Sequence, residues 1–600
     1  MSKRHWVKRW FKGGSKELSI LEEEQMQSPF RTVVGKFCSN KLSMFGLIVF
    51  LCIFLIVFIA PNFVVLDLGY QDSTQINMAP GFNLMSMPEA LKGKVADISV
   101  SSTYSIGVDT EGKVYVWGQP KISKTINMAD IPEEVKNAKI VKVAAGIDHA
   151  IAIDEEGNIY GWGNNRNKQL KYPKDLEEGG IKIVELVAGY QSSAVVDDQG
   201  NVYAWGNTNL NDISVPKDLQ GNIQKVALTG DALLGLTKDG KIEYLGKKNT
   251  AYSKIPEGLE SGVKDIAASS SAVAALKEDG SIVVWGNTGR GLTEVPQTQS
   301  PIVAIFGARY HFDAICEDGS VVAWGQNSFG QTNVPSSLNG KKVTHIFTGY
   351  FQNYALTEDG QVTTWGLSGY LMGTDGLGRD VFVRLINGGR MTMTIGAVAV
   401  IISTFIGIVV GCISGYFGGK VDMFLQRVTE IVSSLPFLPF ALILSAIIGS
   451  SIPEEQRIML IMVVLGVLSW TSLERLVRAQ VLAEREKEFV TAARAMGVRE
   501  LGIVFRHILP NVISVIIVSA TLDFATCMLT ESSLSYLGFG VSPPQPTWGN
   551  MLYGANNSTV IQQYWWQWLF PSIALGLCTI CINLIGDGLR DAIDPKSNDR

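Results

Sequence analysis

A ten-residue motif recurs seven times between residues 109 and 366, and this repetition constrains the fold more than any other feature of the 600-residue chain. Each copy alternates polar and apolar residues, turns at a glycine, resumes the alternation and usually ends in Trp-Gly. The copies are DTEGKVYVWG at 109–118, DEEGNIYGWG at 154–163, DDQGNVYAWG at 197–206, TKDGKIEYLG at 237–246, KEDGSIVVWG at 277–286, CEDGSVVAWG at 316–325 and TEDGQVTTWG at 357–366. Their turn glycines fall 39 to 45 residues apart.

This repeat predicts a β-propeller. An Asp-Gly pair between two alternating runs is a strong hairpin signal, because glycine supplies a positive φ. About 40 residues accommodate four short strands, which make one propeller blade. The Trp recurs at one strand position, with Leu245 in its place in the fourth copy, and should fill the gap between neighbouring blades. Seven units can close a ring and leave few exposed sheet edges. We therefore predict an all-β, seven-bladed propeller over residues 85–367.

Two further stretches make the repeat resemble that of the regulator-of-chromosome-condensation propellers. They are VAAGIDH at 143–149 and WGQNSFGQ at 324–331, and Gly rather than Asp follows the Trp, unlike in WD repeats. The resemblance implies loops gathered at one face, which favours a binding or docking module. A rigid spacer stays open, because a fold alone does not fix function. His149, His311 and His345 lack a neighbouring acidic cluster and are expected to be structural.

Six apolar stretches dominate the rest of the chain. Crossing a membrane takes about 20 apolar residues, and the candidates are residues 44–60, 391–416, 428–448, 458–473, 508–530 and 569–585. We predict a polytopic α-helical membrane domain of about six helices. Its first transmembrane helix lies within 44–65, and five further helices lie within 373–594.

Lys and Arg residues set the direction of these spans, since they favour cytoplasmic flanks. The segment 1–43 carries six basic residues among its first sixteen and no acidic one there, and the loops 417–427 and 474–507 are also basic. In the loops 449–457 and 531–568, Arg457 is the only Lys or Arg residue. Both termini are therefore expected in the cytoplasm, with the propeller on the outer side of a multi-pass membrane protein.

The basic loop contains a patterned stretch, EFVTAARAMGVRELGIVFRHILP at 488–510. Phe489, Ala492, Ala493 and Met496 fall at helical spacings and predict an amphipathic helix, with Arg494 on another face. A glycine follows at position 497, where the helix should end, and a second helical run leads to position 510. Two short helices of this kind suit docking to a soluble partner, or an amphipathic helix on the membrane surface.

This stretch resembles the signature loop of binding-protein-dependent ABC importer permeases, E-A-A-x₃-G-x₉-I-x-L-P. The family's Glu is Thr491 here and its Ile is His507, while the other positions match. The resemblance implies that the loop docks into a groove on an ATP-hydrolysing subunit. The candidate ATPase-coupling residues are Thr491, Ala492, Ala493, Gly497, Ile508, Leu509 and Pro510.

Four other stretches resemble the peptide/nickel branch of these permeases, in particular its second, C-type subunit. They are SPFRTVVGKFCSNKLSMFGLIVF at 28–50, GTDGLGRDVFVRLINGGR at 373–390, ESSLSYLGFGVSPPQPTWGNML at 531–552 and GDGLRDAIDPK at 586–596. The candidate motif residues are Gly373, Thr374, Asp375, Gly378, Arg379, Asp380, Trp548, Gly549 and Asn550. The resemblance implies an ABC type I importer permease fold in a bacterial plasma membrane. It also implies a second permease, two cytoplasmic ATPases and an extracellular solute-binding protein as partners.

Several of these residues have simpler interpretations as well. Asp375, Arg379 and Asp380 can pair structurally or take part in gating, and Trp548 is expected to be an interfacial anchor rather than a substrate contact. The other tryptophans expected to be interfacial anchors are Trp565, Trp566 and Trp568.

The sequence lacks the G-x-x-x-x-G-K-[ST] loop, so we expect no ATPase site, catalytic residue, cofactor or metal in this chain. The net charge of −5 gives no indication of nucleic-acid binding. Peptides are the expected substrate class. The alternatives are nickel or another small solute, a membrane-anchored propeller receptor or sensor, and a cell-wall or inhibitor module.

Overall fold

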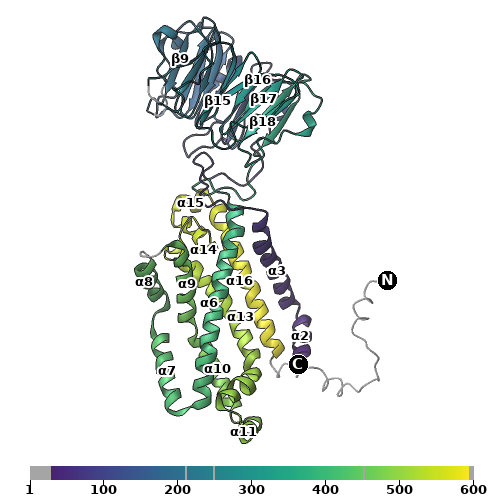
Figure 1. Ribbon diagram of the computed structural model, residues 1–600, viewed down its shortest axis with the longest axis vertical. Helices are drawn as coiled ribbons and strands as arrows, with labels where there is room; N and C mark the ends of the chain where they lie inside the picture. The colour runs from purple at the N-terminus through teal and green to yellow at the C-terminus, as the bar shows by residue number, and fades with distance from the viewer. Residues whose placement is uncertain (1–28, 210–212, 248–249, 450–452, 594–600) are drawn as a thin grey trace, which may run out of the picture. The chain divides into compact units, whose positions relative to one another are not determined.

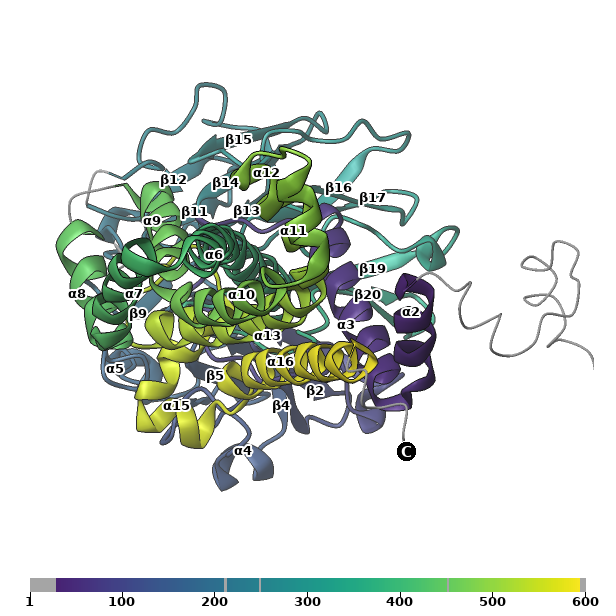
Figure 2. The same ribbon diagram turned by 90° about the horizontal axis from the view of Figure 1, so that it is seen from below.

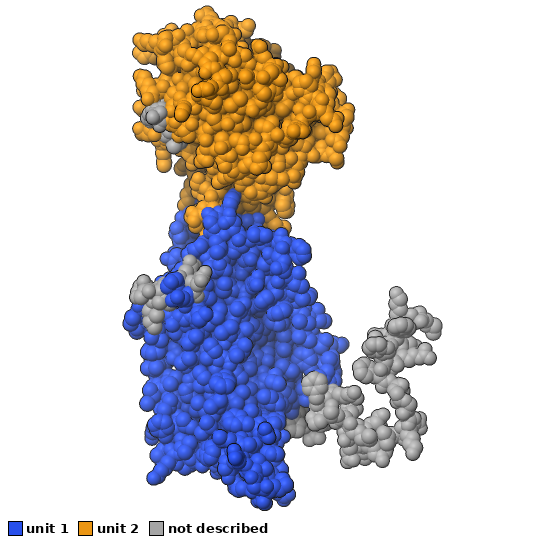
Figure 3. All heavy atoms as spheres, in the orientation of Figure 1, with its two compact units in different colours: residues 1–70, 380–600 blue, residues 71–379 orange. Residues whose placement is uncertain are grey.

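The computed structural model describes residues 29–209, 213–247, 250–449 and 453–593. The chain divides into two compact units (Figure 3). The membrane unit comprises Met1–Tyr70 with Asp380–Arg600, and the seven-sheet unit comprises Gln71–Arg379. The basic residues at 3–16, which predict a cytoplasmic N-terminus, lie outside the described residues, as does the end of the C-terminal motif at 594–596.

The seven-sheet unit contains seven antiparallel sheets of three consecutive strands each. Their strands are β1 (Val95–Val100), β2 (Tyr104–Asp109) and β3 (Val114–Gly118); β4 (Ile140–Ala145), β5 (His149–Asp154) and β6 (Ile159–Gly163); β7 (Ile183–Ala188), β8 (Ser192–Asp197) and β9 (Val202–Gly206); β10 (Ile223–Leu228), β11 (Leu233–Thr237) and β12 (Ile242–Tyr244); β13 (Val263–Ala268), β14 (Ala272–Lys277) and β15 (Ile282–Gly286); β16 (Ile302–Gly307), β17 (His311–Cys316) and β18 (Val321–Gly325); and β19 (Val343–Thr348), β20 (Gln352–Thr357) and β21 (Val362–Gly366).

The predicted hairpins are confirmed, because the motif joins the second and third strands of every sheet. Gly112 shows why glycine is needed there: its φ is +87°, and its N–H donates to the Asp109 carbonyl over 2.9 Å. The prediction of four strands per unit was wrong, since each sheet has three in the described residues. The connection between the first two sheets contains Pro120 and Pro132 and forms the short helix α4 (Glu133–Asn137) instead of a strand. Proline cannot donate to a strand ladder.

Short helical turns occupy similar places in other connections of the seven-sheet unit. They are η3 (Glu89–Leu91), α5 (Lys174–Glu177), η4 (Lys217–Leu219) and η5 (Ser336–Leu338).

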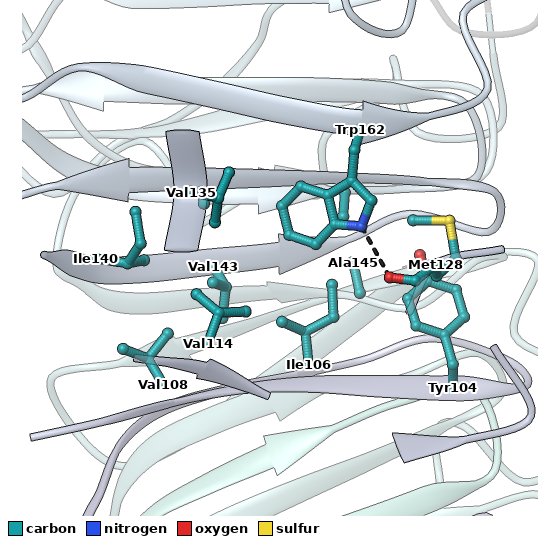
Figure 4. Close-up of a cluster of buried hydrophobic side chains, with 12 residues drawn as sticks. Tyr104, Ile106, Val108, Val114, Met128, Val135, Ile140, Val143, Ala145 and Trp162 are labelled. Carbon is teal, nitrogen blue, oxygen red and sulfur yellow. Dashed lines mark hydrogen bonds between the residues drawn. The ribbon is translucent and has the colours of Figure 1, made fainter. Parts of the chain in front are cut away.

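The repeated Trp fills the space between neighbouring sheets, as predicted. Trp162 of the second sheet packs among Ile106 and Val108 of the first, and its Nε1 donates to the Met128 carbonyl over 2.9 Å (Figure 4). Its side chain therefore closes an apolar gap and also anchors the connection that enters its own sheet. Leu245 is fully buried at the corresponding position and keeps only the apolar contact.

Each sheet packs against the next, and the seventh packs against the first. At this last junction, Trp117 Nε1 donates to Tyr354 Oη over 2.9 Å, and the two rings meet edge to face. The seven sheets therefore follow one another around a common axis, which is the arrangement expected for a propeller.

The membrane unit is helical in its described residues (Figure 1). Its helices are α2 (Pro29–Ser39), α3 (Lys41–Ile59), η2 (Ala60–Asn62), α6 (Val381–Phe417), α7 (Gly419–Ser434), α8 (Phe437–Gly449), α9 (Glu454–Ser469), α10 (Thr471–Glu484), α11 (Glu488–Ala495), α12 (Glu500–Gly502), the π-helix η6 (Ile503–Ile508), α13 (Leu509–Tyr536), α14 (Trp548–Met551), η7 (Leu552–Asn556), α15 (Ser558–Gln563) and α16 (Trp566–Ile593).

Four helices in the described residues are long and apolar enough to cross a membrane, and the number rises to six if two bent pairs each count as one span. The four are Lys41–Asn62, Val381–Phe417, Glu500–Tyr536 and Trp566–Ile593. The bent pairs, Gly419–Ser434 with Phe437–Leu444 at 80° and Gln456–Ser469 with Thr471–Glu484 at 41°, correspond to the third and fourth predicted spans. The 80° bend falls at Pro436, where a helix loses a backbone donor.

The long helices pack side by side (Figure 2). Helix α6 contacts α9, α10 and α13, and α16 contacts both α13 and α3. Large apolar side chains outside these contacts are exposed, for instance Ile401, Phe405, Met423 and Phe424. This distribution fits helices whose outer faces meet lipid or another subunit.

Candidate functional site

The predicted helix pair in the basic loop is present. Helix α11 (Glu488–Ala495) ends at Met496, and Gly497 then turns the chain with a φ of +78°. A second helical run begins at Glu500 and continues through Pro510 into α13. A side chain at position 497 would meet open space, so the backbone conformation is what requires glycine there.

The two faces of α11 differ from the prediction. Val490 and Ala493 are buried against α6, α10 and η6, and Phe489 is partly buried beside them. Ala492 and Met496, which we expected on the same apolar face, are exposed, and the Met496 side chain is 75% exposed. An eight-residue helix can bury only one stripe, and the i, i+3 pair of Val490 and Ala493 occupies it.

The exposed side of α11 is therefore made of small residues and one flexible apolar side chain. Its uncharged residues are Thr491, Ala492, Ala495 and Met496, and the charged Glu488 and Arg494 of α11 are exposed as well. Such a surface presents little bulk close to the helix axis and adapts readily to a facing groove.

A polar cluster fixes this loop to the end of α6. Arg494 Nη2 donates to Tyr416 Oη over 3.1 Å, and the Tyr416 hydroxyl also donates to the Glu500 carboxylate. Arg494 Nε lies 3.5 Å from Glu500 Oε1. The cluster joins α11, the start of the next helical run and α6.

The end of the motif contains an irregular helix. Residues Ile503–Ile508 form the π-helix η6, in which Leu509 N donates to the Val504 carbonyl. Pro510 has no N–H to continue the α-helical ladder, and the wider π turn accommodates this loss. Ile508 is fully buried and Leu509 partly buried, whereas His507 and Pro510 are exposed.

The motif at 373–379 closes the seven-sheet unit rather than forming a separate site. Asp375 accepts from the N–H groups of Leu377 (2.9 Å) and Arg379 (3.1 Å), and its carboxylate pairs with the Arg379 guanidinium at 2.8 Å. Gly373 and Gly378 have φ values of +73° and +74°. The motif is thus a tight turn held by one ion pair.

Backbone bonds tie this turn to the segment that enters the unit. Asp72 N donates to the Leu377 carbonyl over 2.9 Å, and Met78 N donates to Thr374 Oγ1 over 2.8 Å. Further on, Gly81 and Tyr370 form an antiparallel bridge. The two ends of the seven-sheet unit therefore run side by side.

Asp380 has a different role from Asp375. Its Oδ1 accepts from Phe382 N (2.8 Å) and Val383 N (3.4 Å), so it caps the N-terminus of α6. The cap explains why α6 starts ten residues before the predicted span, which began at position 391. The sequence left structural pairing and gating open for Asp375, Arg379 and Asp380. In the structure, Asp375 pairs with Arg379, and Asp380 caps a helix instead of joining this pair.

Trp548 is not at an exposed surface as predicted: its side chain is only 1% exposed. Its Nε1 donates to the Leu385 carbonyl over 2.8 Å, and its N–H donates to Thr392 Oγ1 over 3.0 Å. A Cβ on Gly389 would lie 2.5 Å from the indole. Glycine in α6 thus creates the space that holds Trp548.

The two other candidates in this turn are structural too. Gly549 lies so close to α13 that a Cβ would be 2.5 Å from Ser532 Cα. Asn550 completes a capping box with Thr547 and donates from Nδ2 to the carbonyls of Val541 (3.1 Å) and Gln545 (2.7 Å). Among the later tryptophans, Trp565 is exposed and Trp566 is buried.

A polar cavity in the membrane unit escaped the sequence analysis. Its volume is about 420 Å³, and it lies among α7, α8, α9, α10 and α13. Asp523 and Arg475 line it together with hydroxyl groups, including those of Ser469, Thr526 and Thr530. Asp523 lies inside an apolar span, where an ionisable residue is usually functional. That position was the signal available in the sequence.

Two of the three propeller histidines, His149 and His311, lie inside the packed sheets, whereas His345 in β19 is exposed. His149 Nε2 is 3.0 Å from Ser193 Oγ, and His311 Nε2 is 2.9 Å from Asn353 Oδ1. Burial lowers the pKa of His311 to about 4, and the pKa of His345 is also lowered to about 4, so both are neutral near pH 7. Across the described residues, His, Cys, Asp and Glu form no group of three suited to a metal ion.

Comparison with known families gives three matches. Residues 28–80 match the N-terminal transmembrane domain of oligopeptide transport permease C, and residues 407–599 match the binding-protein-dependent transport system inner membrane component. Between them, residues 140–169 match the regulator of chromosome condensation repeat. The resemblances inferred from the sequence are thereby confirmed.

Individual relatives agree with these matches. A putative peptide permease protein of Brucella suis biovar 1 is 46% identical over 225 residues, which cover 38% of this chain and 72% of that protein. The oligopeptide transport system permease protein OppC of Escherichia coli K12 is 43% identical over 229 residues, covering 38% and 73%. Among solved structures, Prp20p from Saccharomyces cerevisiae is similar at 19% identity and a TM-score of 0.35, covering 50% of this chain and 88% of that chain.

Proposed function

Because this chain belongs to the peptide permease family of binding-protein-dependent transport systems, we propose that it is a pathway-forming subunit of an ATP-driven importer of di- or oligopeptides. The observation that carries the proposal is the exposed side of α11, which lies within the stretch that resembles the family's signature loop and presents Thr491 and Ala492. In this role the chain binds no nucleotide itself and is not an enzyme.

Coupling to the partner ATPases is assigned to this surface. Thr491, Ala492 and Met496 enter a groove on the ATPase, while Ala493 and Ile508 anchor the loop in the apolar cluster behind it. Gly497 and Pro510 set the turn and the helix start that aim the surface. When the ATPases close, the cluster of Arg494, Tyr416 and Glu500 pulls on α6, and the helices rock as rigid bodies.

The polar cavity is assigned to the translocation pathway. A peptide carries an ammonium group and a carboxylate, and the cavity offers one acid, Asp523, and one base, Arg475, among hydroxyls. The bent pairs α7–α8 and α9–α10 line it, so a change in their bends changes its shape. A second permease subunit completes the pathway from the other side.

The assembly follows from the same family. Two cytoplasmic ATPases, a second permease and an extracellular solute-binding protein are the partners, and the exposed apolar side chains of the membrane unit meet the lipid bilayer. The chain lies in the bacterial plasma membrane with both termini in the cytoplasm and the seven-sheet unit outside, in agreement with the basic flanks at 417–427 and 474–507. The seven-sheet unit serves as a binding or docking module.

The test replaces one exposed residue of α11. Ala492→Glu puts a charge on the proposed contact without touching the buried stripe, so uptake of a labelled tripeptide and co-purification of the ATPases should both fall at least tenfold. Ala483→Glu in α10, also exposed but outside the motif, is the matched control and should leave both unchanged. Normal uptake by Ala492→Glu would overturn the coupling role.

Competition identifies the substrate. Excess unlabelled di- and tripeptides should abolish uptake, and nickel should not. Inhibition by nickel alone would instead indicate a metal importer, and ATPase-independent ligand binding with no uptake would indicate a propeller receptor or sensor.

A further inference from the structure

The seven-sheet unit contains an axial cavity of about 410 Å³ that the transport role does not use. It lies where the first strands of the sheets end and their loops turn into the second strands. All seven sheets contribute, for example through Val100 at the end of β1 and Thr348 at the end of β19. A volume of this size is typical of small-molecule sites.

The loops around the cavity hold one another in place. Ile147 N donates to the Tyr190 carbonyl (3.3 Å), Gly230 N to the Ser270 carbonyl (3.1 Å), and Ser270 N to the Arg309 carbonyl (3.0 Å). Each bond joins loops of neighbouring sheets. The cavity wall is therefore preorganised, which reduces the entropy lost when a ligand binds.

Arg309 is the charged group of the cavity, and it is fixed on one side only. Its Nη1 donates to Asp72 Oδ1 (2.7 Å) and Oδ2 (2.6 Å) and to Thr74 Oγ1 (2.7 Å). The Arg309 side chain is 13% exposed and that of Asp72 is 5% exposed. Among the described residues, every hydrogen bond of the Arg309 guanidinium runs from Nη1.

The N–H groups at Nε and Nη2 of Arg309 therefore remain available to donate hydrogen bonds to a ligand. This edge of a guanidinium can form two parallel bonds to a carboxylate. Asp72 acts as a positioning residue here, since it holds the guanidinium in a single orientation. Burial opposes the charge of Arg309, but the hydrogen bonds and the ion pair with Asp72 outweigh it and raise the pKa of Arg309 above its ordinary value.

Aromatic rings lie near the Arg309 guanidinium, and a second cation lies against one of these rings. The Arg309 Cζ lies 5.0 Å from the Tyr310 ring centroid and 5.3 Å from that of Tyr350. The Arg290 Cζ lies 3.9 Å from the Tyr310 centroid. Tyr190, Tyr310 and Tyr350 all line the cavity. Burial raises the pKa of Tyr350, so its hydroxyl remains a neutral donor.

We propose that this cavity binds a small organic carboxylate, with the C-terminal end of a short peptide as its natural form. The carboxylate receives the Nε and Nη2 donors of Arg309 and a tyrosine hydroxyl. The body of the ligand lies against the tyrosine rings, over loops of small residues such as Gly189 and Ser269. The site stands on the geometry of the seven-sheet unit and does not depend on transport by the membrane unit.

Calorimetric titration of the full chain in lipid nanodiscs tests the site. The probes are Ala-Ala-Phe with a free C-terminus, the same peptide as its C-terminal amide, and 3-phenylpropionate. Loss of a bidentate charged contact should weaken the amide roughly 10- to 100-fold relative to the free acid. Equal affinity for acid and amide, or no binding of the free acid at about 1 mM, the weak end of specific binding, would overturn the proposal.

The third probe distinguishes the source of the carboxylate. If 3-phenylpropionate binds as tightly as the peptide, the site recognises carboxylates in general. If the peptide binds more tightly, the peptide chain contributes contacts as well. Both results support carboxylate recognition, and failure of 3-phenylpropionate together with normal binding of the peptide amide would contradict it.

Variants place the binding in the axial cavity. The double variant Asp72→Asn/Arg309→Gln removes both charges, so neither is left buried without its partner, and it should abolish binding of the free acid. Tyr350→Phe keeps the ring and should weaken binding roughly 2- to 10-fold through one lost hydrogen bond. Arg166→Gln, an exposed arginine of the same unit, is the control with unchanged affinity. Full affinity in the double variant would show that the peptide binds elsewhere.

Discussion

The two units of this chain place their apolar residues in opposite ways. In the seven-sheet unit the largest side chains, such as Tyr104, Phe312 and Tyr354, are almost fully buried between sheets. In the membrane unit, Ile401 and Phe424 are 67% and 68% exposed, while Trp548 and small polar residues are inside. Stability in the first unit therefore comes mainly from burial out of water, and in the second from close packing of helices.

The largest expected effect on stability comes from removing a large side chain buried between two sheets of the seven-sheet unit. Trp162→Ala empties the gap between the first two sheets and should lower the free energy of unfolding by about 3–5 kcal/mol. Denaturant unfolding of the full chain in nanodiscs, followed by circular dichroism of the strands, measures it. Phe424→Ala removes an exposed ring of the membrane unit and should change the stability by less than about 0.5 kcal/mol. Equal effects would erase the contrast.

A second prediction concerns charge buried in the seven-sheet unit. Burial raises the pKa of Asp97 to about 6, although the Val143 N–H and Lys142 oppose the shift, and Glu185 adds to it. The native state therefore binds the proton more tightly than the unfolded state, whose Asp has its ordinary pKa near 3.8. Stability falls as the pH rises from about 4 to 6, and the full cost, on the order of 3 kcal/mol, persists above pH 6.

Asp97→Asn should remove this cost while retaining an acceptor for Val143 N. The variant gains stability over the parent chain at pH 7.5, and the gain should vanish near pH 4. Thermal unfolding at both pH values measures it. His345, whose pKa is lowered to about 4, titrates in both proteins, so its contribution cancels in the difference. A gain that is the same at both pH values would contradict the assignment.

A third prediction tests close packing in the membrane unit. Gly389→Ala places a methyl group 2.5 Å from the Trp548 indole, and this overpacking should cost about 1–3 kcal/mol. Gly576→Ala in α16 is the control, since its Cβ would meet nothing within 4 Å. The control should be neutral or slightly stabilising, because alanine favours a helix. Thermal unfolding in mild detergent compares the two, and equal stability would mean that α6 tolerates looser packing.

The smallest effect concerns the helix cap at the junction of the two units. Asp380→Ala removes the acceptor for Phe382 N and Val383 N and should cost about 1 kcal/mol. Asp380→Ser keeps a cap and should restore both stability and peptide uptake. A folded Asp380→Ser protein without uptake would show that the carboxylate takes part in gating as well.

The regular parts of both units could be predicted because a period is visible in the sequence. The turn glycines and the Trp series located the hairpins and the gaps between sheets, and the apolar runs located the long helices. The prediction of four strands per sheet was wrong, because the length of a repeat shows only that a fourth strand would fit. Prolines such as Pro120 lie in the connection where that strand would form, and they cannot donate to a strand ladder. The start of α6 was late, because its first turns carry Arg384 and Asn387 and lie outside the apolar run.

The candidate sites were less predictable, because burial depends on which helix faces which. A helical wheel groups Ala492 with Ala493, yet only the second faces the cluster around Val477. Trp548 suggested an interface, and only the distance to Gly389 explains its burial. Arg309 and Asp72 are 237 residues apart and fall together only when the seven sheets are assembled.

The paired ends of the seven-sheet unit have an evolutionary consequence. The chain enters and leaves through an antiparallel bridge at Gly81 and Tyr370, and Thr374 fastens the same two segments. An inserted unit with such ends enters and leaves at nearly the same point. The membrane unit that carries it therefore needs no longer connection between its own helices to accept the insertion. A recombination event can therefore add or remove the whole module in one step. After its removal, a short turn that joins residues 80 and 371 would reconnect the membrane unit.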